Sequence, residues 1–136
     1  MKRTITALLV ACVLLFSSIS VASAAIFGSV APMAENYLDA EARLKIVSGT
    51  ATVSGNMNGK MGITTKATVH LYLQQYQDGK WVDYDDWTKS VNSINCALSE
   101  TISVPKGYTY RAKASCYAYA GSKSEHVIKY SSEVKY

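Results

Sequence analysis

Period-two alternation of apolar and polar side chains is the feature that most limits what this chain can fold into. It runs through residues 64–76 and again through residues 108–119. The side expected to face a core consists of Ala67, Val69, Leu71 and Leu73 in the first stretch and of Tyr108, Tyr110, Ala112, Ala114, Cys116 and Ala118 in the second. Because successive side chains of a strand point to opposite faces, each stretch is predicted to be a strand with one buried face.

Shorter alternating runs extend this pattern over most of the chain. Further strands are predicted around residues 42–53, 81–87, 98–104 and 125–136, with glycine-containing turns between them. Six or seven strands at this spacing predict an all-β fold, a single antiparallel β-sandwich.

Three short segments predict how the strands are joined or interrupted. Asp78-Gly79 predicts a tight hairpin. The apolar phase shifts at Ser48-Gly49, which predicts a bulge within one strand or a strand that switches sheets. Residues 55–60 are rich in glycine and asparagine, and a loop is expected there.

The two tryptophans pose a problem of parity. In a regular strand, Trp81 and Trp87 would share a face with Asp83 and Asp85. Burying two aspartates between two tryptophans would be costly. We therefore expect a bulge near Asp85-Asp86 or solvent at Asp83, with Trp81 in the core.

The first 24 residues have the three parts of a secretory signal peptide. Lys2 and Arg3 precede an uncharged apolar run over residues 5–16, and Ala22-Ser23-Ala24 is an A-x-A site. Cleavage is expected after Ala24, with Ala25 as the alternative. Two other interpretations are a lipobox ending at Cys12, which lies inside the apolar run, and an uncleaved anchor, for which the run is short of the roughly 20 residues that span a bilayer.

The predicted organisation is a signal peptide over residues 1–24, a loosely ordered segment over 25–41 and a sandwich domain over 42–136. The protein is therefore expected to be secreted, with no membrane partner after cleavage. Without Lys2 and Arg3 the chain has 12 basic and 10 acidic side chains, a net charge of +2, and no block of like charge. That distribution lacks the basic footprint of a nucleic-acid-binding protein.

Part of the chain resembles a known family. The run Pro105-Lys106-Gly107-Tyr108-Thr109-Tyr110-Arg111-Ala112-Lys113-Ala114, then Gly121-Ser122-Lys123-Ser124-Glu125, resembles strand F, the turn and strand G of fibronectin type III-like domains. Trp81 after a hairpin is similar to the core tryptophan of strand C. The resemblance implies an immunoglobulin-like sandwich and carries no activity. Through Leu73-Gln74-Gln75, Lys80-Trp81-Val82, Trp87 and the Gly107 to Arg111 run, the chain also resembles small exported proteins of Gram-positive bacteria.

Two cysteines, Cys96 and Cys116, lie beyond the predicted cleavage site. An even count in an exported chain favours one disulfide, and two free buried thiols are the alternative. The fibronectin type III-like arrangement implies more. There the two strands run antiparallel in opposite sheets, and each cysteine lies ten residues from Lys106. The resemblance thus implies a Cys96–Cys116 disulfide.

Residues that could carry catalysis or hold a metal form no recognisable site. Asp83, Asp85 and Asp86 could bind calcium or act as paired acids, but no EF-hand pattern surrounds them, and a solvated hairpin edge is the simpler interpretation. His70 and His126 are the only histidines, too few for a zinc site. We expect no catalytic residue, no metal and no cofactor, and the chain is not expected to be an enzyme.

Four tyrosines on the polar side of the predicted strands are the candidate ligand-binding residues: Tyr72, Tyr76, Tyr117 and Tyr119. Exposed tyrosines can stack on sugar rings or anchor an interface, or they can simply stabilise a sheet. Their two strands are expected in different sheets. The favoured function is a non-catalytic interaction module for carbohydrate, cell wall or another secreted protein. The alternatives are a small secreted toxin similar to a bacteriocin and a hydrolase using the three aspartates.

Overall fold

A computed structural model describes residues 33–136 of the chain, and it contains β-strands throughout that range. The predicted signal peptide and the start of the predicted leader lie outside the described residues. The strands are β1 (Tyr37–Val47), β2 (Thr50–Gly59), β3 (Lys66–Gln77), β4 (Lys80–Val91), β5 (Asn95–Ser103), β6 (Thr109–Ala120), β7 (Lys123–Tyr130) and β8 (Val134–Lys135).

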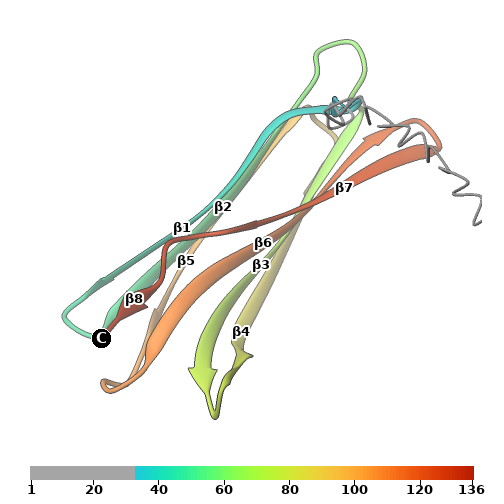
Figure 1. Ribbon diagram of the computed structural model, residues 1–136. Helices are drawn as coiled ribbons and strands as arrows, with labels where there is room; N and C mark the ends of the chain where they lie inside the picture. The colour runs from blue at the N-terminus through green and yellow to red at the C-terminus, as the bar shows by residue number, and fades with distance from the viewer. Residues whose placement is uncertain (1–32) are drawn as a thin grey trace, which may run out of the picture. The chain divides into compact units, whose positions relative to one another are not determined.

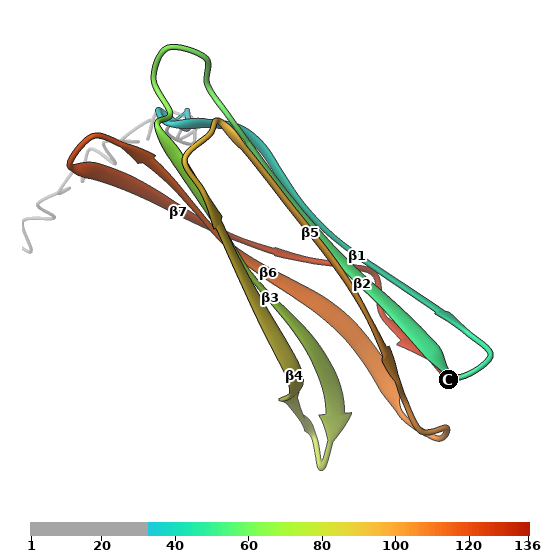
Figure 2. The same ribbon diagram turned by 180° about the vertical axis from the view of Figure 1, so that it is seen from behind.

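The strands form two antiparallel sheets that pack face to face (Figure 1). The smaller sheet has the order β1-β2-β5, and the larger has the order β4-β3-β6-β7, with the two-residue β8 pairing with β6 beyond the end of β7. The chain crosses from the larger sheet to the smaller one between β4 and β5 (Figure 2). The predicted all-β sandwich is confirmed.

The first hairpin differs from the sequence prediction. Ser48 and Gly49 are the two turn residues between β1 and β2, with φ angles of 48° and 82°, and Val47 pairs with Thr50 across them. Two successive positive φ angles are typical of the tight hairpin turn whose twist matches that of its strands. The prediction of a bulge or sheet switch here was wrong, because the phase shift in the sequence marks two strands that meet at a turn. The first of them begins at Tyr37, ahead of the predicted boundary at residue 42.

The glycine- and asparagine-rich segment 55–60 was predicted to be a loop, but most of it belongs to β2. Gly55 pairs with Ala42 on one side and Leu98 on the other. A Cβ atom at this position would lie 3.1 Å from the Cβ of Ala114 in the opposite sheet. Glycine therefore marks a close approach of the two sheets here rather than a turn.

A bulge in β4 separates the two tryptophans. Leu73 of β3 pairs with Asp85 and Gln74 pairs with Asp83, so Tyr84 is the extra residue. The bulge reverses the parity of the strand, which places Trp87 on the inner face and Trp81 on the outer face. The bulge was predicted close to this position, but the expectation that Trp81 lies in the core was wrong.

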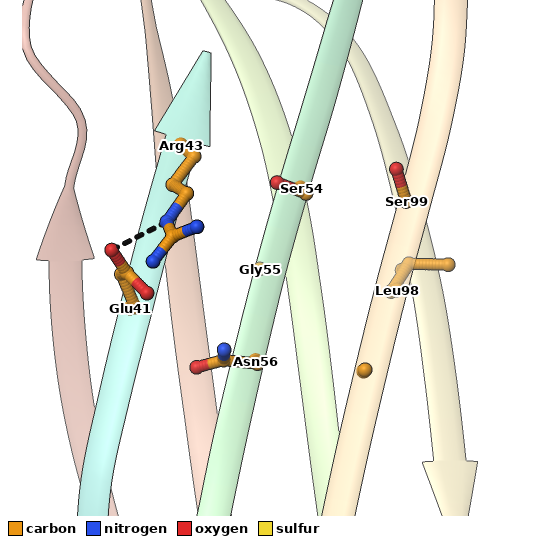
Figure 3. A pocket seen from close by; sticks show the side chains of 8 residues that line it. Glu41, Arg43, Ser54, Gly55, Asn56, Leu98 and Ser99 are labelled. Atoms are coloured by element: carbon orange, nitrogen blue, oxygen red, sulfur yellow. Dashed lines mark hydrogen bonds and ion pairs between the residues drawn. The ribbon is translucent and has the colours of Figure 1, made fainter.

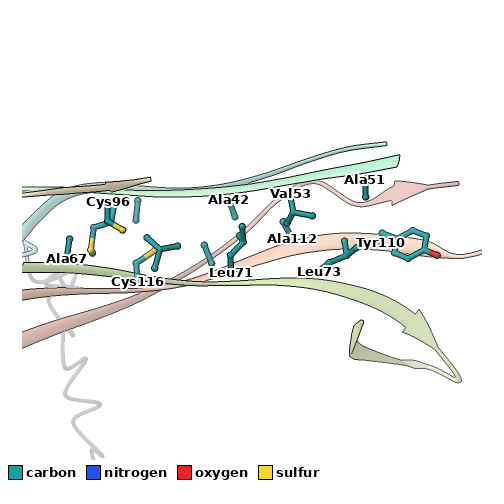
Figure 4. Close-up of a cluster of buried hydrophobic side chains, with 14 of the residues drawn as sticks. Ala42, Ala51, Val53, Ala67, Leu71, Leu73, Cys96, Tyr110, Ala112 and Cys116 are labelled. Carbon is teal, nitrogen blue, oxygen red and sulfur yellow. The ribbon is translucent and has the colours of Figure 1, made fainter. Parts of the chain in front are cut away.

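The core lies between the two sheets and contains the residues that the alternation pointed inward, with one exception (Figure 4). Tyr108 was predicted to face the core but is 40% exposed, because it precedes the first residue of β6. Tyr110, at the start of β6, is the largest fully buried side chain. Its hydroxyl accepts a hydrogen bond from Gln75 Nε2 at 2.9 Å and donates one to the carbonyl oxygen of Pro105 at 2.8 Å. A tyrosine that bonds back to the backbone just upstream of this strand is a feature of immunoglobulin-like sandwiches. The resemblance to fibronectin type III-like domains itself stays a prediction from sequence.

Cys96 and Cys116 point into the core from opposite sheets at the same end of the sandwich (Figure 4). Both are buried free thiols, so the disulfide predicted between them is absent from the structure. Each S–H group has a backbone acceptor of its own: the carbonyl oxygen of Lys89 for Cys96, at 3.5 Å, and that of Asn56 for Cys116, at 3.8 Å. The two cysteines thus pack as small apolar side chains.

These thiols are expected to be unreactive in the folded protein and reactive once it unfolds. Burial raises the pKa of Cys116 to about 12, and the nearby Cys96 adds to that rise. Because the thiolate is the reactive form, a thiol reagent at pH 8 should modify neither cysteine in a Cys12→Ser chain under native conditions. In guanidinium chloride, where the protein is unfolded, the same reagent should modify two thiols per chain. A disulfide would instead leave the unfolded, unreduced chain without reaction.

Candidate functional site

The candidate tyrosines all lie on the outer face of the larger sheet. β3 and β6 are neighbours in that sheet, and Thr68 of β3 pairs with Tyr117 of β6. The expectation that the two strands belong to different sheets was wrong. The pairing brings Tyr72, Tyr76, Tyr117 and Tyr119 onto one continuous surface, which we call the outer aromatic face.

One end of this face is organised around Arg111. Its guanidinium carbon lies 4.2 Å from the ring centroid of Trp81 and 4.2 Å from that of Tyr130. Trp81 comes from β4 and Tyr130 from β7, so the two rings approach from opposite sides of β6. Tyr76 packs on Trp81 with ring centroids 5.2 Å apart. We call these four residues the Arg111 cluster.

Polar contacts hold the Arg111 side chain in place. Its Nε donates a hydrogen bond of 2.8 Å to Gln74 Oε1, and Gln74 Nε2 donates one of 2.7 Å to Asp83 Oδ1. Gln74 is itself buried. The guanidinium is therefore fixed by two rings and a buried amide before any ligand arrives.

A shallow hollow of about 450 Å³ borders the Arg111 cluster. It is lined by two aromatic residues, Tyr76 and Trp81, and by two residues with oxygen-bearing side chains, Thr109 and Glu133. Aromatic faces next to hydrogen-bonding oxygens suit ligands with one apolar side and several hydroxyl groups.

The other end of the face is organised around Tyr117. Its ring stacks on His126 of β7 with centroids 4.3 Å apart and meets the edge of His70 of β3 at 5.7 Å. His126 Nε2 hydrogen-bonds to Ser115 Oγ at 2.7 Å, and His70 Nδ1 to Thr88 Oγ1 at 2.8 Å. The two histidines are thus engaged in packing and hydrogen bonds on either side of one tyrosine ring.

The other two candidate tyrosines, Tyr72 and Tyr119, each contact a lysine. Lys113 Nζ lies 4.7 Å from the centroid of the Tyr72 ring, and Lys66 Nζ lies 5.1 Å from that of Tyr119. Burial raises the pKa of Tyr72, and the charges of Asp86 and Asp83 raise it further. The outer aromatic face is therefore a mixed surface of rings and cations.

The three aspartates considered for calcium binding or hydrolysis do not converge on one point. Asp83 and Asp86 pair with Gln74 and Tyr72 on the outer side of β4, whereas Asp85 pairs with inward-facing Leu73 beyond the bulge. Asp85 Oδ1 accepts a hydrogen bond from the backbone N–H of Asp86. Within residues 33–136, no three His, Cys, Asp or Glu side chains gather as a metal site would require.

The smaller sheet also carries a hollow on its outer face, of about 230 Å³ (Figure 3). Short side chains of β2 and β5, including Ser54, Asn56 and Ser99, form its floor. The ion pair between Arg43 Nε and Glu41 Oε1, at 2.6 Å, borders it on β1. This hollow contains no aromatic ring.

Three of the four members of the Arg111 cluster were not among the predicted site residues: Trp81, Arg111 and Tyr130. Trp81 was assigned to the core because its face depends on where the bulge lies in β4, and the sequence does not give that position. Arg111 and Tyr130 lie on the polar sides of their strands, and the alternation indicates that orientation. Their convergence depends on β6 lying between β3 and β7, which the local pattern does not contain.

No protein-family model matches the chain. No curated protein matches it either. Among solved structures, the chain is similar to the solution structure of R. palustris CsgH, with 10% sequence identity and a TM-score of 0.43, over 68% of this chain and 88% of that chain. A similarity at this level carries no argument about function. Residues 33–136 contain no helix of the length and hydropathy needed to cross a membrane.

Proposed function

We propose that this domain is a non-catalytic module that binds a glycan chain across the outer aromatic face. The observation that carries the proposal is the pair of adjacent rings, Tyr76 and Trp81, beside the oxygens of Thr109 and Glu133 in one hollow. The apolar face of a sugar ring can stack on such side chains while its hydroxyls bond to the neighbouring oxygens. Tyr76 is 44% exposed and available for this contact.

The rest of the face supports an extended ligand rather than a single sugar. Tyr72, Tyr117 and Tyr119 continue from the Arg111 cluster along β3 and β6. β-Strands rise about 3.3 Å per residue, so the line from Arg111 to Tyr119 is about 26 Å long. Several sugar units fit along a surface of that length.

The test is retention of the purified chain on insoluble cell wall and on immobilised polysaccharides. Trp81→Ala and Tyr76→Ala should each weaken retention about fivefold, the effect of losing roughly 1 kcal/mol of stacking. Tyr72→Ala and Tyr117→Ala then show how far the contact extends along the face. Met61→Ala, which removes an exposed apolar side chain in the loop before β3, is the control and should bind as the unmodified chain does.

If the folded protein is retained on none of these materials, the glycan-binding role is wrong. Retention that all variants share would show that the contact lies elsewhere on the molecule. Capture of a defined protein through the same face would assign the surface to a protein partner instead.

A further inference from the structure

Three cations of the outer aromatic face lie over rings rather than beside acids. They are Lys66, Arg111 and Lys113, on the two central strands of the larger sheet. Within residues 33–136 the one ion pair joins Arg43 to Glu41, on the smaller sheet. The positive charges of the face are therefore not neutralised by a carboxylate in direct contact.

Arg111 is the best prepared of the three to bind an anion. A guanidinium has five N–H donors in one plane, and its geometry matches the two oxygens of a carboxylate. Nε is engaged by Gln74, and the rings of Trp81 and Tyr130 pack against the group. No other side-chain hydrogen bond from this guanidinium is found among the described residues. A group held in this way loses little conformational freedom when a ligand binds.

From this arrangement we infer that the glycan bound by the outer aromatic face is an anionic polysaccharide with carboxylate groups. This inference rests on the proposed glycan-binding function and names the chemical class of its ligand. Arg111 binds one carboxylate through its free N–H groups, and Lys113 faces the next part of the polysaccharide. The two side chains are two residues apart on one strand and point to the same side, so their backbone positions are about 6.6 Å apart.

The acidic residues around the outer aromatic face limit where an anionic polysaccharide can lie. Asp83 and Asp86 are on the edge strand β4, and Glu133 lies in the hollow beside Trp81. The charges of Asp83 and Asp86 turn the carboxylates of the polysaccharide away from the β4 edge and toward the β3–β6 centre, where the cations are, while its sugar rings can still stack on Tyr76 and Trp81. Glu133 remains able to accept a hydrogen bond from a sugar hydroxyl.

The test compares polygalacturonate with its fully methyl-esterified form, which has the same sugar backbone without the charges. The unmodified chain should bind the acid form at least about tenfold more tightly, the effect of one charge-assisted hydrogen bond or more. Added salt should weaken binding to the acid form and leave binding to the ester unchanged. Arg111→Gln should remove most of the preference, and Arg111→Lys, which keeps the charge without the planar fork, should retain part of it.

Lys45→Gln is the matched control, because it removes one positive charge from the outer face of the smaller sheet. An equal loss in this variant and in Arg111→Gln would overturn the site in favour of general attraction to a basic protein. If Arg111→Gln unfolds, which its circular dichroism spectrum would show, the preference of Lys113→Gln for the acid form over the ester provides a second test.

The remaining outcomes separate the two proposals. Equal binding to the acid and ester forms, unchanged by Arg111→Gln and Lys113→Gln, would overturn the anionic ligand and leave glycan binding in place. If the folded protein binds neither polymer, and binds neither cell wall nor any other polysaccharide, both proposals are wrong.

Discussion

Replacing Tyr110 with alanine is expected to lower the free energy of unfolding by about 4 kcal/mol, the cost typical of truncating a large buried aromatic side chain. The Tyr110 side chain is fully buried, and its ring meets those of Tyr84 and Tyr108 edge to face. Truncation leaves a cavity and also leaves Gln75 Nε2 and the Pro105 carbonyl without their partner. A loss of this size is a large part of the 5–15 kcal/mol that stabilises a typical domain.

Urea unfolding followed by tryptophan fluorescence measures this change. Tyr110→Phe is the control that keeps the ring and removes only the hydroxyl, and it should cost about 1–2 kcal/mol through the two lost hydrogen bonds. Similar stabilities for the alanine variant and the original chain would show that Tyr110 does not fill the core as described.

Replacing Gly55 with valine is expected to lower the free energy of unfolding by about 2 kcal/mol, although valine is a better strand former than glycine. The gain in strand propensity amounts to at most about 1 kcal/mol. Against it stands the contact with the opposite sheet, where a Cβ would lie 3.1 Å from Leu71 Cδ1 and 3.2 Å from Val69 Cγ1. Forcing extra carbon atoms into such a packed layer costs about 3 kcal/mol, and this contact outweighs the propensity.

Ser54→Val is the matched control. Ser54 directly precedes Gly55 in β2, and it lines the outer hollow of the smaller sheet. That variant should be as stable as the original chain or slightly more stable. Thermal unfolding by circular dichroism compares the two. If Gly55→Val were the more stable of the pair, the sheets would have to lie further apart at this point than the structure places them.

The long strands could be predicted because burial on one face is recorded directly in the sequence. Every second residue from Ala67 to Leu73 and from Tyr110 to Ala118 is fully buried, as the alternation predicted. The Asp78-Gly79 turn was also predicted correctly, and both residues have positive φ angles. These features depend on neighbours in the chain, so local reasoning is sufficient for them.

Local reasoning failed where two interpretations of a short pattern depend on distant residues. A glycine can end a strand, as Gly49 does, or let another sheet approach, as Gly55 does. Only the position of Ala114, Leu71 and Val69 in the opposite sheet distinguishes the two. Trp81 was placed in the core for the same reason: the position of the bulge relative to Gln74 and Leu73 decides its face.

The alternation in the sequence was enough to predict an all-β sandwich, the core-facing residues of the long strands apart from Tyr108, and the outward orientation of Tyr72, Tyr76, Tyr117 and Tyr119. The three-dimensional arrangement was needed to show that β3 and β6 are neighbours in one sheet, that Trp81 and Tyr130 converge on Arg111, and that Cys96 and Cys116 are free thiols in the core. The side of a strand on which a residue lies follows from its position relative to its two neighbours in the chain. Its partners across that surface depend on strand order and register, and residues far apart in the sequence set these together.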